Sequence, residues 1–234
     1  MSETAVAQAT RLRAHQDIAD GTMAFHFEKP AGFDFKAGQA VELLLPDPAG
    51  GANDIGHAFS IVTAPFETDL VIATRMRDSA YKNALKALPA GAQVRLDGPF
   101  GSLTMHNKRT RAAVFIAGGI GITPFMSMIR QEVRDGMPHQ VTLIYSNRRR
   151  KDSAFLAELE SAAKANASFR LVSTMTEEGG GFVDAAMIAK AAEGLPEPIF
   201  YVAGPPAMVE AMRKMLAEAG VDSDDIRSED FYGY

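Results

Sequence analysis

Three glycines in the middle of the chain lie where a strand is expected to turn into a helix. Gly118, Gly119 and Gly121 follow residues 113–117, an apolar run typical of a strand buried on both faces of a parallel sheet. Glycine lets the backbone turn tightly and lets a ligand approach it closely. The N–H groups at a helix start suit a pyrophosphate or a carboxylate. A tight connection without a ligand explains the glycines about as well.

Thr123 and Pro124 open the helix that follows this turn. Thr123 fits the N-cap, and Pro124 fits the first helical position, where its missing N–H costs nothing. Phe125, Met128 and Ile129 then recur at helical spacing, so one face of the helix is predicted to be buried.

Four consecutive cations, Arg148-Arg149-Arg150-Lys151, follow another apolar run. The carboxyl ends of parallel strands form the usual ligand side of such a sheet. These cations could therefore hold a phosphate or an acidic partner. A solvated loop is the alternative interpretation.

The composition excludes several classes of protein. The 234 residues carry a formal net charge of -5, which argues against a general nucleic-acid-binding surface. The absence of cysteine excludes disulfides, thiolate catalysis and cysteine-ligated iron–sulfur clusters, so redox chemistry would need a dissociable cofactor. The five histidines lack metal-ligand spacing, so no metal site is predicted. No apolar run approaches the roughly 18 residues of a membrane span, and the first residues lack the apolar segment of a secretion signal. We expect a cytoplasmic protein with no membrane partner.

The first 108 residues read as an all-β unit, because turn signals separate short strands. The expected strands are 22–27, 40–45, 59–63, 70–75 and 93–97. This spacing predicts a small antiparallel β-barrel of the Greek-key type. One helix, about 79–88, interrupts it, with Ser79 as the cap and Ala80, Ala84, Leu85 and Leu88 on one face.

From residue 110 onward strands and helices alternate. The expected strands are 114–117, 140–146, 170–174 and 199–203, and the expected helices are 124–135, 152–165, 184–193 and 206–219. Such alternation predicts a doubly wound parallel sheet. We therefore expect two domains, 1–108 and 109–234, joined near residues 106–111.

Four motifs occur in an order typical of one family. They are His57-Ala58-Phe59-Ser60, the GPFG at 98–101, the GGIGITP at 118–124 and the AGPPAM at 203–208. From about Ala9 to Tyr234 the chain resembles the ferredoxin–NADP reductase superfamily. The resemblance implies a flavin-binding barrel followed by a nicotinamide-binding α/β domain.

On the flavin side, the resemblance implies that the His57-Ala58-Phe59-Ser60 motif contacts the cofactor. Phe59 would lie against the flavin ring, and Ser60 would approach its reactive nitrogen. Phe59 as an ordinary core residue is the alternative. The family motif is usually Arg-x-Tyr-Ser, so His57 removes a charged phosphate partner.

Other residues could compensate for that loss. They are Arg75, Arg77 and Ser79 at the helix start, although a solvated strand edge explains the arginines as well. FAD is the expected flavin, with FMN possible.

On the nicotinamide side, the resemblance assigns the Gly118–Thr123 turn to the nicotinamide cofactor. Its pyrophosphate would lie over the helix start, where Pro124 follows, and its nicotinamide near Thr123. Gly204 and Pro205, with Met208 behind them, would let the nicotinamide approach the flavin. Ala203 stands where most relatives have cysteine. NADH is mildly favoured, because no arginine follows Ser173 and Thr174. Arg148 and Arg149 leave NADPH open.

At the carboxyl end, the resemblance implies that Glu229 is a carboxylate near the active site. Phe231 or Tyr234 would cover the flavin as a movable gate. An edge strand that packs Phe231 into the core is the alternative.

The resemblance thus implies an NAD(P)H-dependent flavoprotein reductase, with Ser60, Thr123 and Glu229 as catalytic residues. Electrons would pass to a ferredoxin, a flavodoxin, an oxygenase component or a small oxidant. Two other functions remain open. One is a non-catalytic flavin- or nucleotide-binding regulatory subunit, and the other is a free flavin or ferric reductase.

Overall fold

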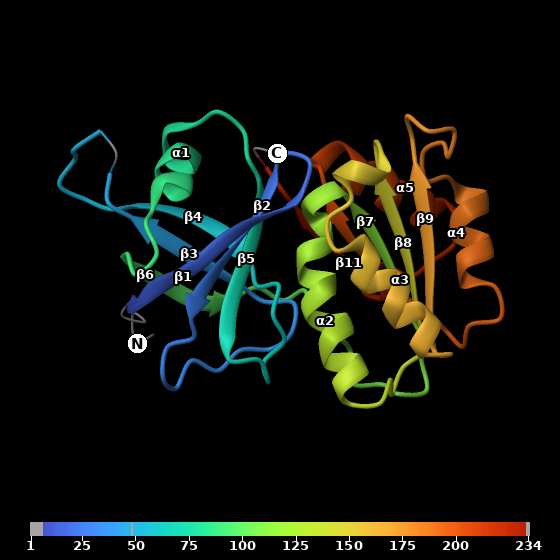
Figure 1. The fold of residues 1–234 in the computed structure, drawn as a ribbon. Helices are drawn as coiled ribbons and strands as arrows, with labels where there is room; N and C mark the ends of the chain where they lie inside the picture. Colours follow the sequence, from blue (N-terminus) through green and yellow to red (C-terminus); the bar gives the residue numbers. More distant parts are fainter. Residues whose placement is uncertain (1–6, 48, 233–234) are drawn as a thin grey trace.

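Two sheets of opposite kind lie side by side in the molecule, with helix α2 between them (Figure 1). The computed structural model describes residues 7–47 and 49–232. The first sheet is antiparallel and the second is parallel. The two-part architecture expected from the sequence is therefore confirmed.

Six strands form the antiparallel sheet, in the order β4-β3-β6-β1-β2-β5. They are β1 (Gln8–Ala19), β2 (Thr22–Glu28), β3 (Ala40–Leu45), β4 (Ile55–Ser60), β5 (Asp69–Arg75) and β6 (Gln93–Phe100). An isolated antiparallel bridge between Ile61 and Ile72 brings the two edges of this sheet together. Alternate side chains point inward and form an apolar core that includes Phe25, Val41 and Leu43.

The sequence prediction missed β1 and misplaced β4. Strand β1 pairs with both β2 and β6, but most of its side chains are exposed and polar, so it lacks the apolar pattern of a strand. Strand β4 ends at Ser60 rather than Thr63, because Ile61 leaves β3 to bridge Ile72.

Helix α1 (Ala80–Ala87) begins after Ser79, as predicted, and the Ser79 hydroxyl accepts a hydrogen bond from the Lys82 N–H. Its predicted buried face is only partly right, because Ala80 is exposed while Tyr81 and Lys82 are buried. The Tyr81 hydroxyl donates to the Leu43 carbonyl at 2.6 Å. Because the polar ends of both side chains find backbone acceptors, they are tolerated on the inner face.

The parallel sheet has the order β11-β10-β7-β8-β9. Its strands are β7 (Ala113–Gly118), β8 (Val141–Asn147), β9 (Phe169–Met175), β10 (Ile199–Gly204) and β11 (Ile226–Asp230). The helices are α2 (Thr123–Arg134), α3 (Leu156–Ala165), α4 (Ala185–Ala192) and α5 (Pro206–Glu218). Helices α2 and α3 pack on one face and α4 and α5 on the other, so the sheet is doubly wound. The strand order reverses between β7 and β10, which is where such sheets bind ligands.

The glycine turn differs in detail from the prediction. Residues 119–122 form a 3₁₀ helix, so Ile122 is the N-cap of α2 and Thr123 is already helical. The Thr123 hydroxyl donates backward to the Ile120 carbonyl at 3.1 Å and caps nothing. The backbone of Gly119 is left-handed, with φ of 55°, and the 3₁₀ helix begins at this residue, four positions before Thr123.

Barrel and α/β residues share one apolar core. Val62 and Val71 belong to the same buried cluster as Phe125, Met128 and Ile129 of α2. The boundary that we propose between residues 108 and 109 lies in the segment 101–112, which connects β6 to β7. Within the described residues, no helix combines the length and apolar character that crossing a bilayer requires.

Candidate functional site

A cavity of about 640 Å³ opens at the point where the strand order reverses. The carboxyl ends of β7, β8 and β10, helix α5 and the end of β5 surround it. The sequence-predicted residues among those that line it are Arg75, Arg77, Gly118, Gly119, Gly121, Arg148, Gly204, Pro205, Met208 and Phe231. The tertiary structure thus brings most of the predicted nicotinamide side together with two arginines of the barrel.

The glycine turn at residues 118–121 lies in close contact with the backbone of residues 203–204. A Cβ atom on Gly121 would lie 2.3 Å from the Ala203 carbonyl oxygen, and one on Gly204 would lie 3.2 Å from Gly118 Cα. A Cβ on Gly118 would meet the Met208 sulfur at 2.3 Å, whereas around Gly119 the space is open. Glycine is therefore required at Gly121, where backbone atoms touch the turn, whereas the flexible Met208 side chain can move away from a Cβ at Gly118.

The polar part of the cavity is cationic. Arg75, Arg77 and Arg148 line it, and none of its described lining residues is Asp or Glu. The Arg148 side chain is exposed and makes no hydrogen bond or ion pair with another described residue. Three guanidinium groups in a lining that contains no Asp or Glu favour an anionic ligand that carries phosphate.

Asn147 is a lining residue that sequence reasoning missed. Its side chain is buried, yet neither amide atom has a hydrogen-bond partner among the described residues. A buried amide without partners costs free energy, so a ligand that bonds to it would recover that cost. Its position directly after a buried strand, beside Arg148, was a usable signal.

Phe182 is the second residue that was missed. Its side chain is 82% exposed at the cavity wall, in the loop between β9 and α4. With Ala211 and Met215 of α5, it gives one part of the cavity an apolar lining that suits a flat ring. Nothing in the local sequence pattern marks this residue.

The other three cations of the run after β8 do not line the cavity. Arg149 forms a bidentate pair with Asp152, Arg150 pairs with Glu160, and Lys151 pairs with Asp20. Hydrogen bonding from Arg149 lowers the pKa of Asp152, and Arg148 contributes further. Only Arg148 of this run faces the cavity.

The predicted flavin motif on β4 is divided between solvent and core. His57 and Ala58 are exposed, whereas Phe59 lies in the barrel core with Val41 and Leu43. The alternative interpretation of Phe59 as a core residue therefore describes its place in this structure. The His57 ring contacts the Tyr81 ring at 4.1 Å between centroids. Partial desolvation, followed by the charge of Lys82, lowers the pKa of the otherwise exposed His57, which favours the neutral ring near pH 7.

Two predicted catalytic side chains have a buried oxygen without a hydrogen-bond partner among the described residues. Ser60 is buried, and its hydroxyl has no hydrogen-bond partner among the described residues. One carboxylate oxygen of Glu229 is also buried and unpartnered. Glu229 lies beside Ala203 in the register of β11 on β10, and burial raises its pKa to about 6. Such orphaned groups fit a ligand that supplies their missing partners.

Thr123 and Pro124 are buried at the start of α2 and do not line the cavity. The Thr123 hydroxyl is already bonded to Ile120. Ser79 is exposed at the start of α1, on the barrel side. Several of the predicted segments therefore line the cavity, but not every predicted side chain does.

The carboxyl-terminal segment has the edge-strand arrangement that was the alternative interpretation of the tail, and its proposed role as a gate stays a prediction. It is an edge strand, and the Phe231 N–H continues it by donating to the Gly204 carbonyl at 2.9 Å. The Phe231 ring packs against the shared core and also lines the cavity. Tyr234 lies outside the described residues.

Comparison with known proteins decides the family. A family model of the oxidoreductase NAD-binding domain matches residues 115–214. Ferredoxin–NADP reductase B of Sorangium cellulosum (strain So ce56) is 30% identical over 236 residues, which cover 94% of this chain and 95% of that protein. The chain belongs to the ferredoxin–NADP reductase superfamily. It is therefore an oxidoreductase of this flavin- and NAD(P)-dependent superfamily.

Other similar proteins differ from this chain in length. Phenoxybenzoate dioxygenase subunit beta of Ectopseudomonas oleovorans is 32% identical over 99% of this chain and 70% of its own length. The chain spans 61% of one propane 2-monooxygenase reductase component and 57% of another. A ferredoxin NADP⁺ reductase from Neisseria gonorrhoeae, solved with bound FAD and NADP, has the same fold. Its TM-score is 0.83 at 22% identity, over 96% of this chain and 98% of that one.

Proposed function

We propose that this reductase takes hydride from NADPH onto bound FAD and passes the electrons to a separate acceptor protein. The observation that carries the proposal is the cavity at the strand reversal, where the glycine turn, Gly204 and three arginines meet. Bound FAD supplies the ring that accepts hydride and then releases electrons. The residues of this chain supply binding, orientation and exclusion of water.

The proposed binding surface for the nicotinamide nucleotide has a polar part and an apolar part. Its pyrophosphate fits the open space at Gly119, and its phosphates face Arg148. Asn147 offers an unused amide to a ribose hydroxyl, and Phe182 offers a ring to the adenine. Gly204 and Pro205 leave room for the nicotinamide end.

The flavin side is proposed around β4, α1 and the end of β5. Ser60 has an unpaired hydroxyl for the ring edge, and Ser79 stands at the start of α1. Arg75 and Arg77 take the place of the missing arginine at His57, because a neutral histidine is a weak phosphate partner. Glu229, on the opposite sheet beside Ala203, offers a carboxyl group that can hold or release a proton.

NADPH is the donor that this cavity favours. A 2′-phosphate needs a cation with free donors, and Arg148 has them at the carboxyl end of β8. This is the position at which dinucleotide-binding sheets read the ribose 2′ group. The weak preference for NADH depends on the end of β9, which has no arginine, and Arg148 outweighs it.

The acceptor is proposed to be a redox protein, such as a ferredoxin or an oxygenase component. Relatives of this chain are named as ferredoxin reductases and as parts of oxygenase systems. None of these 234 residues is a cysteine that could hold an iron–sulfur cluster, so the next electron carrier lies outside them.

The absorbance of the purified protein tests the proposal. We expect a flavin band near 450 nm that bleaches under anaerobic NADPH, faster than under NADH. A flavin band that never bleaches would indicate a non-catalytic binding subunit. Colourless protein that acts only on added flavin would indicate a free flavin or ferric reductase. Mass measurement after acid release separates FAD from FMN.

A further inference from the structure

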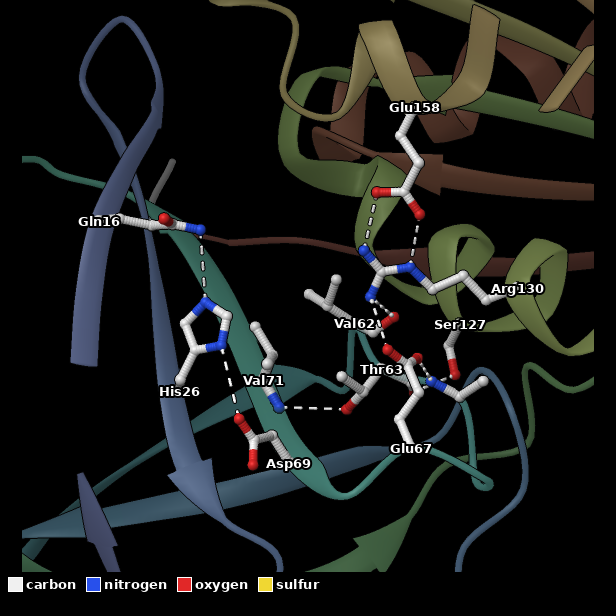
Figure 2. Close-up of polar contacts among 11 residues, drawn as sticks. Gln16, His26, Val62, Thr63, Glu67, Asp69, Val71, Ser127, Arg130 and Glu158 are labelled. Atoms are coloured by element: carbon white, nitrogen blue, oxygen red, sulfur yellow. Dashed lines mark hydrogen bonds and ion pairs between the residues drawn. The ribbon is translucent and has the colours of Figure 1, made fainter. Parts of the chain in front are cut away.

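The two halves of the molecule are tied together on α2, away from the cavity. Figure 2 shows this contact, in which Ser127 and Arg130 reach toward the barrel loop that follows β4. Both side chains come from the helix that begins at the glycine turn. Neither residue lines the nucleotide cavity.

Ser127 makes the shorter connection. Its hydroxyl donates to the Thr63 carbonyl at 2.7 Å, and both residues are buried. The Thr63 hydroxyl in turn accepts from the Val71 N–H of β5 at 3.1 Å. The loop is therefore held to its own barrel strand and to α2 at the same residue.

Arg130 makes a broader connection across three elements. Its guanidinium donates two hydrogen bonds to Glu158 of α3, at 2.7 and 2.8 Å. One of its nitrogens lies 3.6 Å from a Glu67 carboxylate oxygen and 3.5 Å from the Val62 carbonyl, both on the barrel loop. The arginine side chain is 22% exposed, so this bridge is partly shielded from water.

These contacts lie close in the chain to both proposed reaction partners. Thr63 is three residues after Ser60, and Ser127 is one helical turn after Thr123. A displacement of α2 against the loop would therefore shift the glycine turn relative to the end of β4. Displacements of about 1 Å between reacting groups can slow a reaction about 100-fold.

We propose that Ser127 and Arg130 are positioning residues that set the spacing between the nicotinamide side and the flavin side. This inference rests on the proposed function for its kinetic consequence, but its structural part does not. The two residues contribute no atom to the cavity, so they act on geometry rather than on cofactor affinity.

Stopped-flow reduction by NADPH tests the kinetic part in Ser127→Ala and Arg130→Met. We expect the limiting rate of flavin bleaching to fall about 10-fold or more. Flavin retention and the dissociation constant of NADP⁺ should stay within about twofold of wild type. Arg130→Lys, which keeps the charge but loses the forked geometry, should recover only part of the rate.

Arg150→Ala is the matched control, because Arg150 pairs with Glu160 of the same helix α3 without a contact to the barrel. It should leave the rate unchanged. Wild-type rates in both test variants would overturn the proposal, and so would equal slowing in Arg150→Ala. If Ser127→Ala fails to fold, Arg130→Met decides, because its side chain is partly exposed.

Amide hydrogen exchange in cofactor-free protein gives a readout that is independent of activity. We expect residues 61–71 to exchange faster in both test variants than in wild type or Arg150→Ala. Unchanged exchange would overturn the tie between the two halves. A wild-type protein that binds flavin but never bleaches would refute the proposed function instead, and the exchange result would still decide this inference.

Discussion

At the level of single residues, Glu229 has a carboxyl group whose pKa the fold shifts upward. Burial raises its pKa from the ordinary value of 4.5 to about 6. The folded protein then holds this proton more tightly than the unfolded chain, so its contribution to stability falls as pH rises from about 4.5 through 6. The difference between these two pKa values corresponds to a cost of about 2 kcal/mol above pH 6.

We expect Glu229→Gln to remove this cost. Urea unfolding of the cofactor-free protein should show the variant gaining up to about 2 kcal/mol over wild type at pH 8 and little at pH 4. Asp230→Asn, an exposed carboxylate on the same strand, is the control. A difference between wild type and Glu229→Gln that does not change with pH would contradict the burial argument.

Arg148 is the residue on which the proposed preference for NADPH over NADH depends. Losing one charged hydrogen-bond partner of a phosphate costs about 1.5 to 3 kcal/mol, or roughly 10- to 100-fold in affinity. We therefore expect Arg148→Ala to raise the KM for NADPH about that much, while the kcat/KM for NADH changes little. Steady-state kinetics with both nucleotides measure this.

Arg150→Ala serves again as the comparison, because that arginine belongs to the same cationic run but lies outside the cavity. Arg150→Ala should change neither the KM for NADPH nor the kcat/KM for NADH. An equal loss with NADPH and NADH in Arg148→Ala would assign Arg148 to the shared pyrophosphate, and the preference for NADPH would then be wrong.

The turn after β7 is the element at the proposed nucleotide site, and its glycines differ in what they tolerate. Gly121→Ala would place a methyl group 2.3 Å from the Ala203 carbonyl oxygen, so backbone has to move. We expect it to lower the thermal midpoint and to weaken NADP⁺ binding more than tenfold. Gly119→Ala enters open space, and its φ of 55° costs only about 1 to 2 kcal/mol.

Thermal unfolding and calorimetric titration of the oxidised protein with NADP⁺ compare the two variants. Gly119→Ala should lower the thermal midpoint less than Gly121→Ala does, because no protein atom beyond its chain neighbours lies within 4 Å of the added methyl group. A thermal midpoint that falls further in Gly119→Ala than in Gly121→Ala would show that close backbone packing is not what requires glycine in this turn.

At the scale of the whole molecule, one apolar core joins the barrel to the α/β part. Val62, Val71 and Leu103 pack in the same cluster as Phe125 and Met128. Separating the two parts would expose this surface, at about 25 cal/mol for each Å² of apolar area. The barrel is therefore not expected to unfold alone.

Hydrogen exchange during urea unfolding tests this expectation. Peptides from β2 and β5 should lose protection at the same urea concentration as peptides from β7 and β8, in cofactor-free protein. Two separate midpoints would show that the parts unfold independently. Arg150→Ala, outside the shared core, should keep the two sets of peptides coincident.

The amino-acid sequence by itself determined the class of fold and several of the segments that line the cavity. The alternation of apolar runs with turn residues is a local property, so it predicted most of the barrel strands, the doubly wound sheet and the start of α5 at Pro206. The order of its motifs indicated the family, which the relatives confirm. Its lack of cysteine limits the redox chemistry, because a chain without thiolates cannot ligate an iron–sulfur cluster through cysteine in any fold.

Only the tertiary structure decided which side chains face the cavity. Arg148 and Arg149 are neighbours in the chain, yet one lines the cavity and the other pairs with Asp152. Phe59 lies in the barrel core, and Ser127 reaches Thr63, 64 residues away. Such outcomes depend on strand pairing and packing between distant segments, which local spacing does not specify.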